Sequence, residues 1–486
     1  MFEISEIRTL TILQLNDSHG YLEPHPEIMF KSGRTTTRTA GGFAQIATIF
    51  NQIQLEKPNA VLTLDNGDTF HGTFPVVQSQ GKAMVPILNA LAIDAMTAHW
   101  EFAYGPAEFQ ALTHKLDYPM LAINCYSKDT KTPIFSPGTI IERNDLNVGV
   151  VGIASNIVDK TMPSSFSEGV YFTLGNEELP DYISHLRNKE RVDLVVVLSH
   201  LGYPQDLKLA SEVDGIDILL SSHTHNRLYQ PVVINHAVII QSGCHGSFIG
   251  RIDLKISNNR VKTYKHRLIT VDESTPPNTA IQGKIQNILS KSVRSNLETV
   301  IGKTRNTLSR WRTLESTMDN LLLQACLDAS GVDIALSNGW RFGAPIPPGN
   351  VTLNDLYNII PDNPPISVCD ITGAELWQMM EDNLENTFSR DPYRQMGGYV
   401  KRCLGLNIYC KIENPYRKRI HEFFVSGNTI NPTKTYKACF LTVQGIPTHY
   451  GKNRHQLHIK AIDALKSYIE THSPVTATYT GAIVPI

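Results

Sequence analysis

The sequence predicts an α/β protein with two domains. In the first half of the chain, β-branched and other apolar runs alternate with segments whose apolar residues recur at helical spacing. Alternation of this kind predicts helices that cover both faces of a sheet. The expected strands are Thr9–Leu15, Val61–Leu64, Met120–Asn124, Val148–Ile153, Val192–Ser199, Val238–Gln241 and Arg251–Ile256, and the expected helices are Phe43–Ile53, Met84–Leu91 and Pro180–Lys189.

A polar segment with two prolines, Asp272–Asn278, marks a domain boundary. Ile281–Val293 is expected to form a connecting helix, and a second α/β region begins near Ile301. We therefore expect a first domain over residues 1–272, a linker with a helix over 273–299, and a smaller domain over 300–486. The second region is expected to hold helices at Ser316–Ala329 and Gly373–Thr387, and strands at Asp333–Leu336, Leu406–Ile412 and Thr435–Leu441.

The composition is that of a folded soluble protein, with 486 residues, 41% apolar and 19% charged. The net charge is −2, and no basic stripe favours a nucleic acid partner. No apolar run is long enough to span a membrane, and the first residues have no signal-peptide pattern. Seven cysteines without a CxxC spacing predict free thiols, so we expect a cytoplasmic protein.

Metal-binding residue types gather in five segments of the first half. These residues are Asp17, His19, Asp68, His99, His200, His223 and His225. Four of the segments directly follow an apolar run, namely Leu10–Leu15, Val61–Leu64, Leu194–Leu198 and Ile216–Leu220. Because the carboxyl ends of strands meet at one edge of an open sheet, we expect these side chains to converge.

Five imidazoles and two carboxylates suit Zn, Mn, Fe or Ni better than an all-oxygen cation. A carboxylate shared between two ligand sets can hold two ions roughly 3.5–4 Å apart, which polarise an ester oxygen and generate hydroxide near neutral pH. Taken alone, Asp17 and Asp68 are typical of turns, and His200 is typical of a buried core histidine. The five segments together favour a metal-dependent hydrolase.

The same segments resemble the metallophosphoesterase domain of the 5′-nucleotidase family. They read Asn16-Asp-Ser-His-Gly20, Gly67-Asp-Thr-Phe-His-Gly72, Ala98-His-Trp-Glu-Phe-Ala-Tyr-Gly105, Ser199-His-Leu-Gly202 and Ser222-His-Thr-His225. The second region is similar to the family's C-terminal domain at Leu336–Arg341, Ile346–Tyr357, Ile371–Leu376 and Thr435–Ala438. The resemblance implies a sandwich of two sheets flanked by helices, followed by a smaller α/β substrate-binding domain.

The resemblance also implies roles for particular residues. Asp17, His19 and His225 would hold one divalent ion, His200 and His223 the other, and Asp68 both. His99 falls where the family has an asparagine ligand, and Mn²⁺ or Zn²⁺, with Fe as an alternative, are the expected ions. Arg341 matches the family's phosphate-contacting arginine, Asn338 and Phe440 are expected substrate contacts, and His99 and Arg341 are expected to serve catalysis.

The sequence departs from the family at its catalytic His/Asp dyad, where Trp100 and Ala103 stand instead. An indole N–H cannot give up its proton as an acid. His71 and His245 are the candidates to replace the missing dyad. Both are expected to lie around the metal ligands, and so is Trp100. Asp362 also stands where the family has one of its base-stacking rings, which weakens the expectation of a nucleoside substrate.

The motifs and the departures from the family leave three alternative functions. The first is hydrolysis of a small-molecule phosphate ester, a nucleotide 5′-phosphate by family precedent, by a hydroxide that two metal ions activate. The second is cleavage of a sulfur-containing ester, because Ser337–Gly343 and Asp391–Gly398 look like the branch with the sulfur-oxidation thiosulfohydrolase. The third is a binding protein that keeps its metals and has lost its chemistry.

Overall fold

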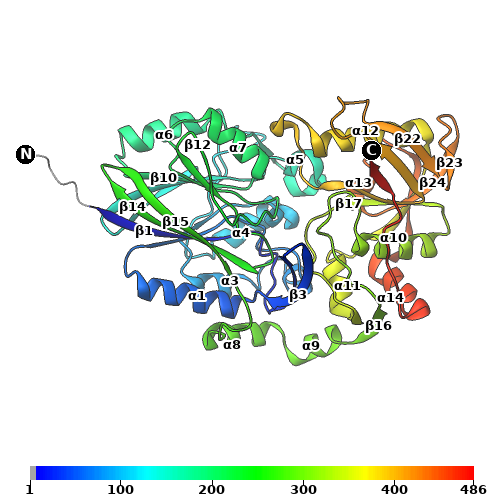
Figure 1. Cartoon of the computed structure of the whole chain (residues 1–486), viewed down its shortest axis with the longest axis horizontal. Helices are drawn as coiled ribbons and strands as arrows, with labels where there is room; N and C mark the ends of the chain where they lie inside the picture. The colour runs from blue at the N-terminus through cyan, green and yellow to red at the C-terminus, as the bar shows by residue number, and fades with distance from the viewer. Residues whose placement is uncertain (1–6) are drawn as a thin grey trace, which may run out of the picture. The chain divides into compact units, whose positions relative to one another are not determined.

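Figure 1 shows a computed structural model of the chain, which describes residues 7–486 except the side chains of residues 291 and 292. Its contacts divide the chain into two units. The first unit joins the chain up to His25 with Thr39–Leu289, and the second joins Pro26–Arg38 with Ser290–Ile486. Across residues 7–486, no helix combines the length and apolar character needed to cross a membrane.

The first unit contains two mixed sheets. One has the order β15-β14-β1-β4-β5, with β15 at Arg260–Thr270, β14 at Phe248–Ser257, β1 at Arg8–Leu15, β4 at Val61–Asp65 and β5 at Ala95–Met96. The other has the order β12-β13-β11-β10-β8-β7, with β12 at Val232–Ile234, β13 at Ala237–Ile240, β11 at Ile218–Leu220, β10 at Leu194–Ser199, β8 at Leu146–Ile153 and β7 at Gly138–Arg143. Strands β1, β4 and β5 run parallel, and so do β8, β10, β11 and β13.

The two sheets pack face to face, because alternate residues of each strand enter a common core. Leu10 and Ile12 of β1 share one hydrophobic cluster with Val196 of β10. The intervening residues Val195 and Val197 face the opposite side, in a separate cluster. Strands buried on both faces are apolar throughout, which explains the continuous apolar runs in the sequence.

Helices cover the outer faces of this sandwich. Helix α6 (Leu179–Asn188) and helix α7 (Tyr203–Glu212) pack on the second sheet through residues such as Ile183 and Leu209. Helix α1 (Phe43–Glu56) begins after the Gly41-Gly42 pair and buries an apolar face. The expected α/β architecture is therefore confirmed. Each sheet carries helices on one face only, because the other face of each sheet packs against the partner sheet.

Most of the expected elements are present, and two expectations were wrong. Met120–Asn124 forms only isolated bridges, because the chain turns at Asn124, whose amide bonds to the carbonyls of Ala154 and Thr173. The expected helix Ile281–Val293 is two helices, α8 (Thr279–Ile288) and α9 (Lys291–Leu297). Ser290 has an extended backbone between them, so the helix cannot continue.

The second unit is built on a five-stranded sheet and a four-stranded sheet. The first has the order β20-β17-β24-β19-β25, with β20 at Tyr399–Leu404, β17 at Ile334–Gly339, β24 at Thr435–Phe440, β19 at Pro365–Thr372 and β25 at Lys452–Lys460. The second has the order β23-β22-β21-β26, with β23 at Asn428–Thr429, β22 at Ile420–Val425, β21 at Leu406–Cys410 and β26 at Ile483–Pro485. The flanking helices include α10 (Thr317–Ser330), α11 (Leu353–Ile359), α12 (Gly373–Phe388), α13 (Thr442–Gly445) and α14 (Ala461–His472).

A buried ion triad lies beside the five-stranded sheet. The Asp319 carboxylate accepts hydrogen bonds from Arg310 Nε at 2.8 Å and Arg402 Nε at 3.0 Å, and all three side chains are at most 2% exposed. Ser316 Oγ also donates to this carboxylate at 2.7 Å. Asp319 therefore holds two buried guanidinium groups from distant parts of the chain.

We expect Asp319→Ala to lower the free energy of unfolding by about 3–5 kcal/mol, because it leaves two buried arginines without their anion. Urea denaturation followed by circular dichroism measures this change. Asp328→Ala is the matched control, since Asp328 lies on the same helix but is exposed. Equal stability of the two variants would contradict this role for Asp319.

Candidate metal centre

The seven predicted ligands follow the carboxyl ends of five strands in the first unit. Asp17 and His19 follow β1, Asp68 follows β4, His99 follows β5, His200 follows β10, and His223 and His225 follow β11. Strand β5 has only two residues, so the sequence has no apolar run that predicts this strand. Parallel strands bring these ends together, as expected from the sheet edge.

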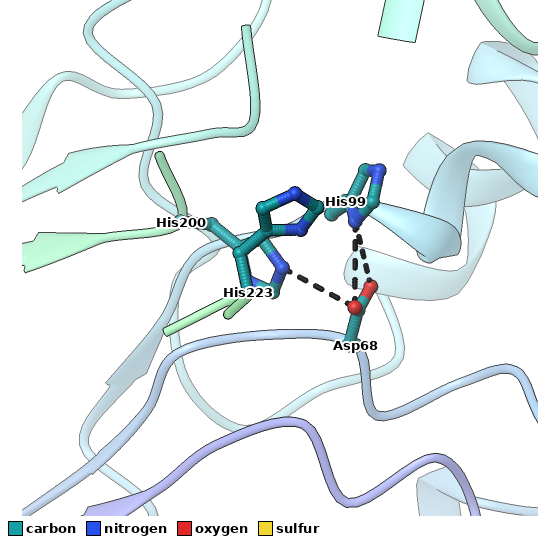
Figure 2. Close-up of side chains that lie close together, drawn as sticks. All are labelled: Asp68, His99, His200 and His223. Atoms are coloured by element: carbon teal, nitrogen blue, oxygen red, sulfur yellow. Dashed lines mark hydrogen bonds and ion pairs between the residues drawn. The ribbon is translucent and has the colours of Figure 1, made fainter. Parts of the chain in front are cut away.

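The side chains form two groups that share one carboxylate. Ligand atoms of Asp68, His99, His200 and His223 all lie within 4.8 Å of one another, and so do those of Asp17, His19, Asp68 and His225. Figure 2 shows the first group, with the imidazoles gathered around the Asp68 carboxylate. An arrangement of two ligand sets with one common carboxylate can hold two cations side by side.

Short distances join the carboxylates to the imidazoles. Asp68 Oδ1 lies 3.2 Å from His99 Nδ1, and Asp68 Oδ2 lies 3.3 Å from His200 Nε2. Asp17 Oδ1 lies 3.4 Å from His225 Nε2 and 3.7 Å from His200 Nε2. Asp17, Asp68, His99 and His200 are almost completely buried, so water cannot compensate these groups.

The orientation of two imidazoles fits a cation. His19 Nδ1 bonds to the carbonyl of His71 at 3.2 Å, and His200 Nδ1 bonds to the carbonyl of Asn66 at 2.6 Å. A carbonyl only accepts, so Nδ1 of each ring carries a proton, and Nε2 is the nitrogen that can bind a cation once it is unprotonated. His19 Nε2 faces His225 Nε2 at 3.3 Å, about the spacing of two ligands bound 2.0–2.1 Å from one ion.

Five of the seven residues have strained backbones. Asp17, His19, Asp68, His223 and His225 have φ between 49° and 69°, in the left-handed region that non-glycine residues rarely adopt. Gly67 supports the turn before Asp68, since a Cβ there would lie 2.7 Å from the carbonyl oxygen of Thr97. Such strain persists only where the surroundings enforce it, and it concentrates at functional sites.

Buried polar side chains enforce these loop conformations. Asn66 donates to the carbonyls of Ser199 and Leu220, which ties the Asp68 loop to the loops of two histidines. Glu101 accepts from the backbone N–H of His99 at 2.7 Å and of Thr69 at 2.6 Å. The same two side chains therefore position ligands from both sheets.

Asp206 of helix α7 connects two further ligand loops. Its carboxylate accepts from Ser199 Oγ at 2.6 Å and Ser221 Oγ at 2.5 Å, and these serines precede His200 and His223. Burial raises the pKa of Asp206 to about 7, although the two hydroxyls oppose the rise. No local sequence pattern indicates this role of Asp206, because the role depends on how helix α7 packs against the two loops.

Electrostatics in the cluster favours ionised carboxylates. Burial raises the pKa of Asp68, but the neighbouring His99 and His200 outweigh it and hold that pKa well below its usual value. Burial lowers the pKa of His200, but Asp68 and Asp17 outweigh it and raise that pKa to about 10. Burial also lowers the pKa of His19, to about 3. Without metal, His200 therefore carries the proton that balances the carboxylates.

Each of the two units contains a segment that matches the model of a known protein family. Residues 10–227 match the family model of calcineurin-like phosphoesterases, and residues 293–442 match that of the 5′-nucleotidase C-terminal domain. The chain belongs to the 5′-nucleotidase family. It is a hydrolase of the phosphoesterase class.

Relatives within this family are distant. The chain is 24% identical to the trifunctional nucleotide phosphoesterase YfkN of Bacillus subtilis over 88% of its length, and it spans 31% of that longer protein. It is 25% identical to the 5′-nucleotidase of Bos taurus, over 84% of this chain and 76% of the relative.

Two solved structures from Thermus thermophilus share the fold. The sulfate thiohydrolase SoxB has a TM-score of 0.90 at 24% identity, with 98% of this chain and 96% of the other covered. A 5′-nucleotidase precursor has a TM-score of 0.85 at 22% identity, with 98% and 99% covered. These likenesses confirm the two-part α/β fold expected of the family.

The family's dyad position is occupied by an aromatic stack. The Trp100 backbone N–H donates to Asp68 Oδ1 at 2.8 Å, and its ring stacks on His71 with centroids 4.6 Å apart. His71 in turn supports His19 through its carbonyl. Trp100 and His71 thus both lie next to predicted ligands, and their roles at the site stay predictions.

His245 also lies beside the cluster. Its ring centroid is 6.0 Å from those of His19 and His225, and its backbone N–H donates to the carbonyl of Asp17 at 2.7 Å. Cys244 Sγ lies 3.5 Å from His245 Nδ1. His245 therefore borders the Asp17 ligand set, and His71 borders the same set from another loop.

The predicted substrate contacts lie in the second unit. Arg341 Nη2 donates to the carbonyl of Gly398 at 2.9 Å, and its guanidinium lies over the Tyr399 ring. Asn338 is half-buried at the end of β17. Phe440 is buried in the core with Arg454 over its ring, so it offers solvent almost no surface. The roles of these residues stay predictions.

We expect metal binding to release about one proton near pH 7.5, because an ion can bind His200 Nε2 only after the imidazolium loses its proton. Since the pKa of His200 is raised to about 10, metal affinity should rise with pH, by about tenfold per unit between pH 6 and 9. Titration calorimetry with Mn²⁺ in buffers of different ionisation enthalpy measures the release. An enthalpy independent of the buffer would contradict it.

Proposed function

We propose that this protein hydrolyses phosphate monoesters or diesters at two divalent ions held by Asp17, His19, Asp68, His99, His200, His223 and His225. The observation that carries the proposal is the pair of ligand groups that meet at Asp68. Two bound ions would polarise the ester oxygen and lower the pKa of water. The imidazole-rich ligand set favours Mn²⁺ or Zn²⁺, with Fe as an alternative.

The chain's own residues would hold the reacting groups in place. Asp68 belongs to both ligand groups and so would fix the spacing of the two ions. The carbonyls of His71 and Asn66 keep the Nε2 atoms of His19 and His200 available as ligands. His99 would supply an imidazole where the family has an amide. An imidazole binds transition ions more strongly than an amide oxygen does.

Nucleotide 5′-phosphates are the first substrates to test, on the precedent of the related nucleotidases. Arg341 and Asn338 of the second unit would contact the anionic or polar part of such a substrate, with Phe440 as a further predicted contact. Seven buried free cysteines support a reducing, cytoplasmic compartment.

The sulfur-ester alternative is supported by the altered dyad and by the fold shared with the thiohydrolase at 24% identity. Neither observation favours it over phosphate esters, which the family matches support directly. The third alternative, a metal-retaining binding protein, is opposed by the complete set of ligands.

Asp68→Asn should reduce Mn²⁺-dependent hydrolysis of p-nitrophenyl phosphate to the level of the EDTA-treated protein, because both ligand groups lose their common carboxylate. Activity and bound metal per chain are measured together. Asp117→Asn, an exposed aspartate of the same unit, is the control and should retain full activity.

Retained activity in Asp68→Asn would refute the metal centre. Nucleotides, phosphodiesters and a thiosulfonated thiol should be assayed in parallel with the wild-type protein. Release of sulfate from the thiosulfonate, without phosphate from any ester, would favour the sulfur alternative.

We also expect the rate to depend steeply on the leaving group, because Trp100 cannot donate a proton where the family has its histidine. Missing general-acid help is typically worth about 10²–10⁴ in rate. Alkyl phosphates should therefore be cleaved about 10²–10⁴ times more slowly than aryl phosphates, measured as kcat/KM over a series of leaving groups. In the double variant Trp100→His/Ala103→Asp this difference should shrink. A flat dependence in the wild type would show that another residue donates the proton.

A further inference from the structure

Asp206 is a fully buried acid in the first turn of helix α7, within the first unit. Its carboxylate accepts from Ser199 Oγ at 2.6 Å and from Ser221 Oγ at 2.5 Å. Its backbone N–H donates to the carbonyl of Gly202, which fixes the turn that carries it. Burying a carboxyl group is costly unless hydrogen bonds compensate it, so the two hydroxyls account for its stability at this place.

Strand β10 places Ser199 and His200 on opposite faces of its sheet. Val197 packs in the cluster on the helix side, whereas Leu198 packs in the core between the two sheets. Ser199 continues the first row and bonds to the carboxylate of α7. His200 continues the second row, and its Nδ1 bonds to the carbonyl of Asn66, which follows a strand of the other sheet. Holding the serine therefore fixes the backbone from which the imidazole projects.

Strand β11 repeats this arrangement. Leu219 packs on the helix side and Leu220 in the core between the sheets, so Ser221 extends the helix-side row. His223 follows two residues later. One carboxylate therefore ties the ends of two neighbouring parallel strands together, at the points where two imidazoles enter the ligand cluster.

The two imidazoles that Asp206 controls belong to the same ligand group. Ligand atoms of His200 and His223 lie within 4.8 Å of each other and of those of Asp68 and His99 (Figure 2). Because His200 and His223 come from adjacent strands, their separation depends on how the ends of those strands are held. The bridge at Asp206 is one such restraint, and it acts from the helix side of the sheet.

The side chains of the other ligand group are held by different contacts. Asp17 Oδ2 accepts from Asn16 Nδ2 at 2.6 Å, and the His19 ring bonds to the carbonyl of His71. The backbone N–H of His223 also reaches the Asp17 carboxylate, at 3.1 Å, which joins the two groups through the main chain. The orientations of Asp17 and His19 are thus set without the Asp206 carboxylate.

His225, the remaining imidazole of that group, shares a loop with His223. Gln241 holds this part of the loop, because it bonds to Thr224 Oγ1 at 3.1 Å and accepts from the backbone N–H of Asn226. These two residues lie on either side of His225. The position of His225 therefore has its own restraint from strand-end residue Gln241.

We propose that Asp206 is a positioning residue for one of the two metal sites. By bridging the two strand ends it sets the spacing of the His200 and His223 imidazoles. The site that contains Asp17 and His19 keeps its geometry without this bridge. The inference rests on the two ion sites of the proposed function and deepens it, since it makes the two ions separable by a change on helix α7.

Loss of the carboxylate should weaken one ion site without destroying it. Two buried hydroxyls would lose their acceptor, and the strand ends would be free to move apart. Residues that orient metal ligands typically contribute about 10–100-fold to metal affinity. Asp206 acts through the serines and not on the imidazoles directly, so we expect a loss of about tenfold, at the lower end of that range.

The test measures Mn²⁺ binding to the EDTA-treated full chain by titration calorimetry, in two backgrounds that each keep one ligand group intact. His19→Ala keeps the group of Asp68, His200 and His223, and His99→Ala keeps the group with Asp17. Adding Asp206→Ala should weaken Mn²⁺ binding about tenfold in the His19→Ala background and less than about twofold in the His99→Ala background. Equal weakening in both backgrounds, or none in either, would overturn the assignment.

The comparison of backgrounds separates positioning from a general loss of stability, which would weaken both sites alike. Glu212→Ala is the matched control, since Glu212 is an exposed acid on the same helix, and it should change neither affinity. If Asp206→Ala does not fold, Ser199→Ala removes one of the two bonds and should weaken Mn²⁺ binding only in the His19→Ala background. Unchanged affinity of Ser199→Ala in that background would then overturn the assignment.

The two proposals fail in different ways. A selective loss of Mn²⁺ affinity, in a protein whose metal-loaded wild type cleaves no phosphate ester, would sustain the role of Asp206 and refute the proposed function. Hydrolysis by the wild type, with Asp206→Ala binding Mn²⁺ as its backgrounds do, would do the reverse. A wild type that binds fewer than two Mn²⁺ ions would overturn both, and its own titration shows this before any variant is compared.

Discussion

The structure of the first unit depends on the Asp68 carboxylate and its imidazole neighbours. Asp68 lies 3.2–3.3 Å from nitrogens of His99 and His200 and also belongs to the group with Asp17 and His19. Bringing so many titratable groups out of water is unfavourable unless opposite charges compensate them. In the metal-free protein, the proton on His200 supplies part of that compensation, and two cations would supply the rest.

The residues of this cluster have backbone conformations that are energetically unfavourable in isolation. The left-handed backbone of Asp17, His19 and Asp68 costs energy at each position, and a network of buried amides and carboxylates maintains it. Asn66 and Asp206 each connect loops from different strands, so the ligand geometry is carried by the sheets and not by the loops alone.

The second unit also buries charged side chains, and these include cations. Two buried arginines share the Asp319 carboxylate, and the ammonium group of buried Lys401 donates to the carbonyl of Gln444. The first unit instead gathers buried carboxylates and imidazoles, which suit cations.

The sequence alone determined the α/β class, most strands and helices, and the identity of the seven residues that converge. It could do so because strands buried on both faces leave long apolar runs, and the ligands directly follow four of them. It did not determine the two-residue strand β5 before His99, the break at Ser290, or the exposed strand β15, since these have little hydrophobic signal. Only the tertiary structure decided that Asp206 connects two histidine loops and that the buried ammonium group of Lys401 donates to the carbonyl of Gln444. Those relations depend on contacts between residues far apart in the chain, and local sequence patterns carry no information about such contacts.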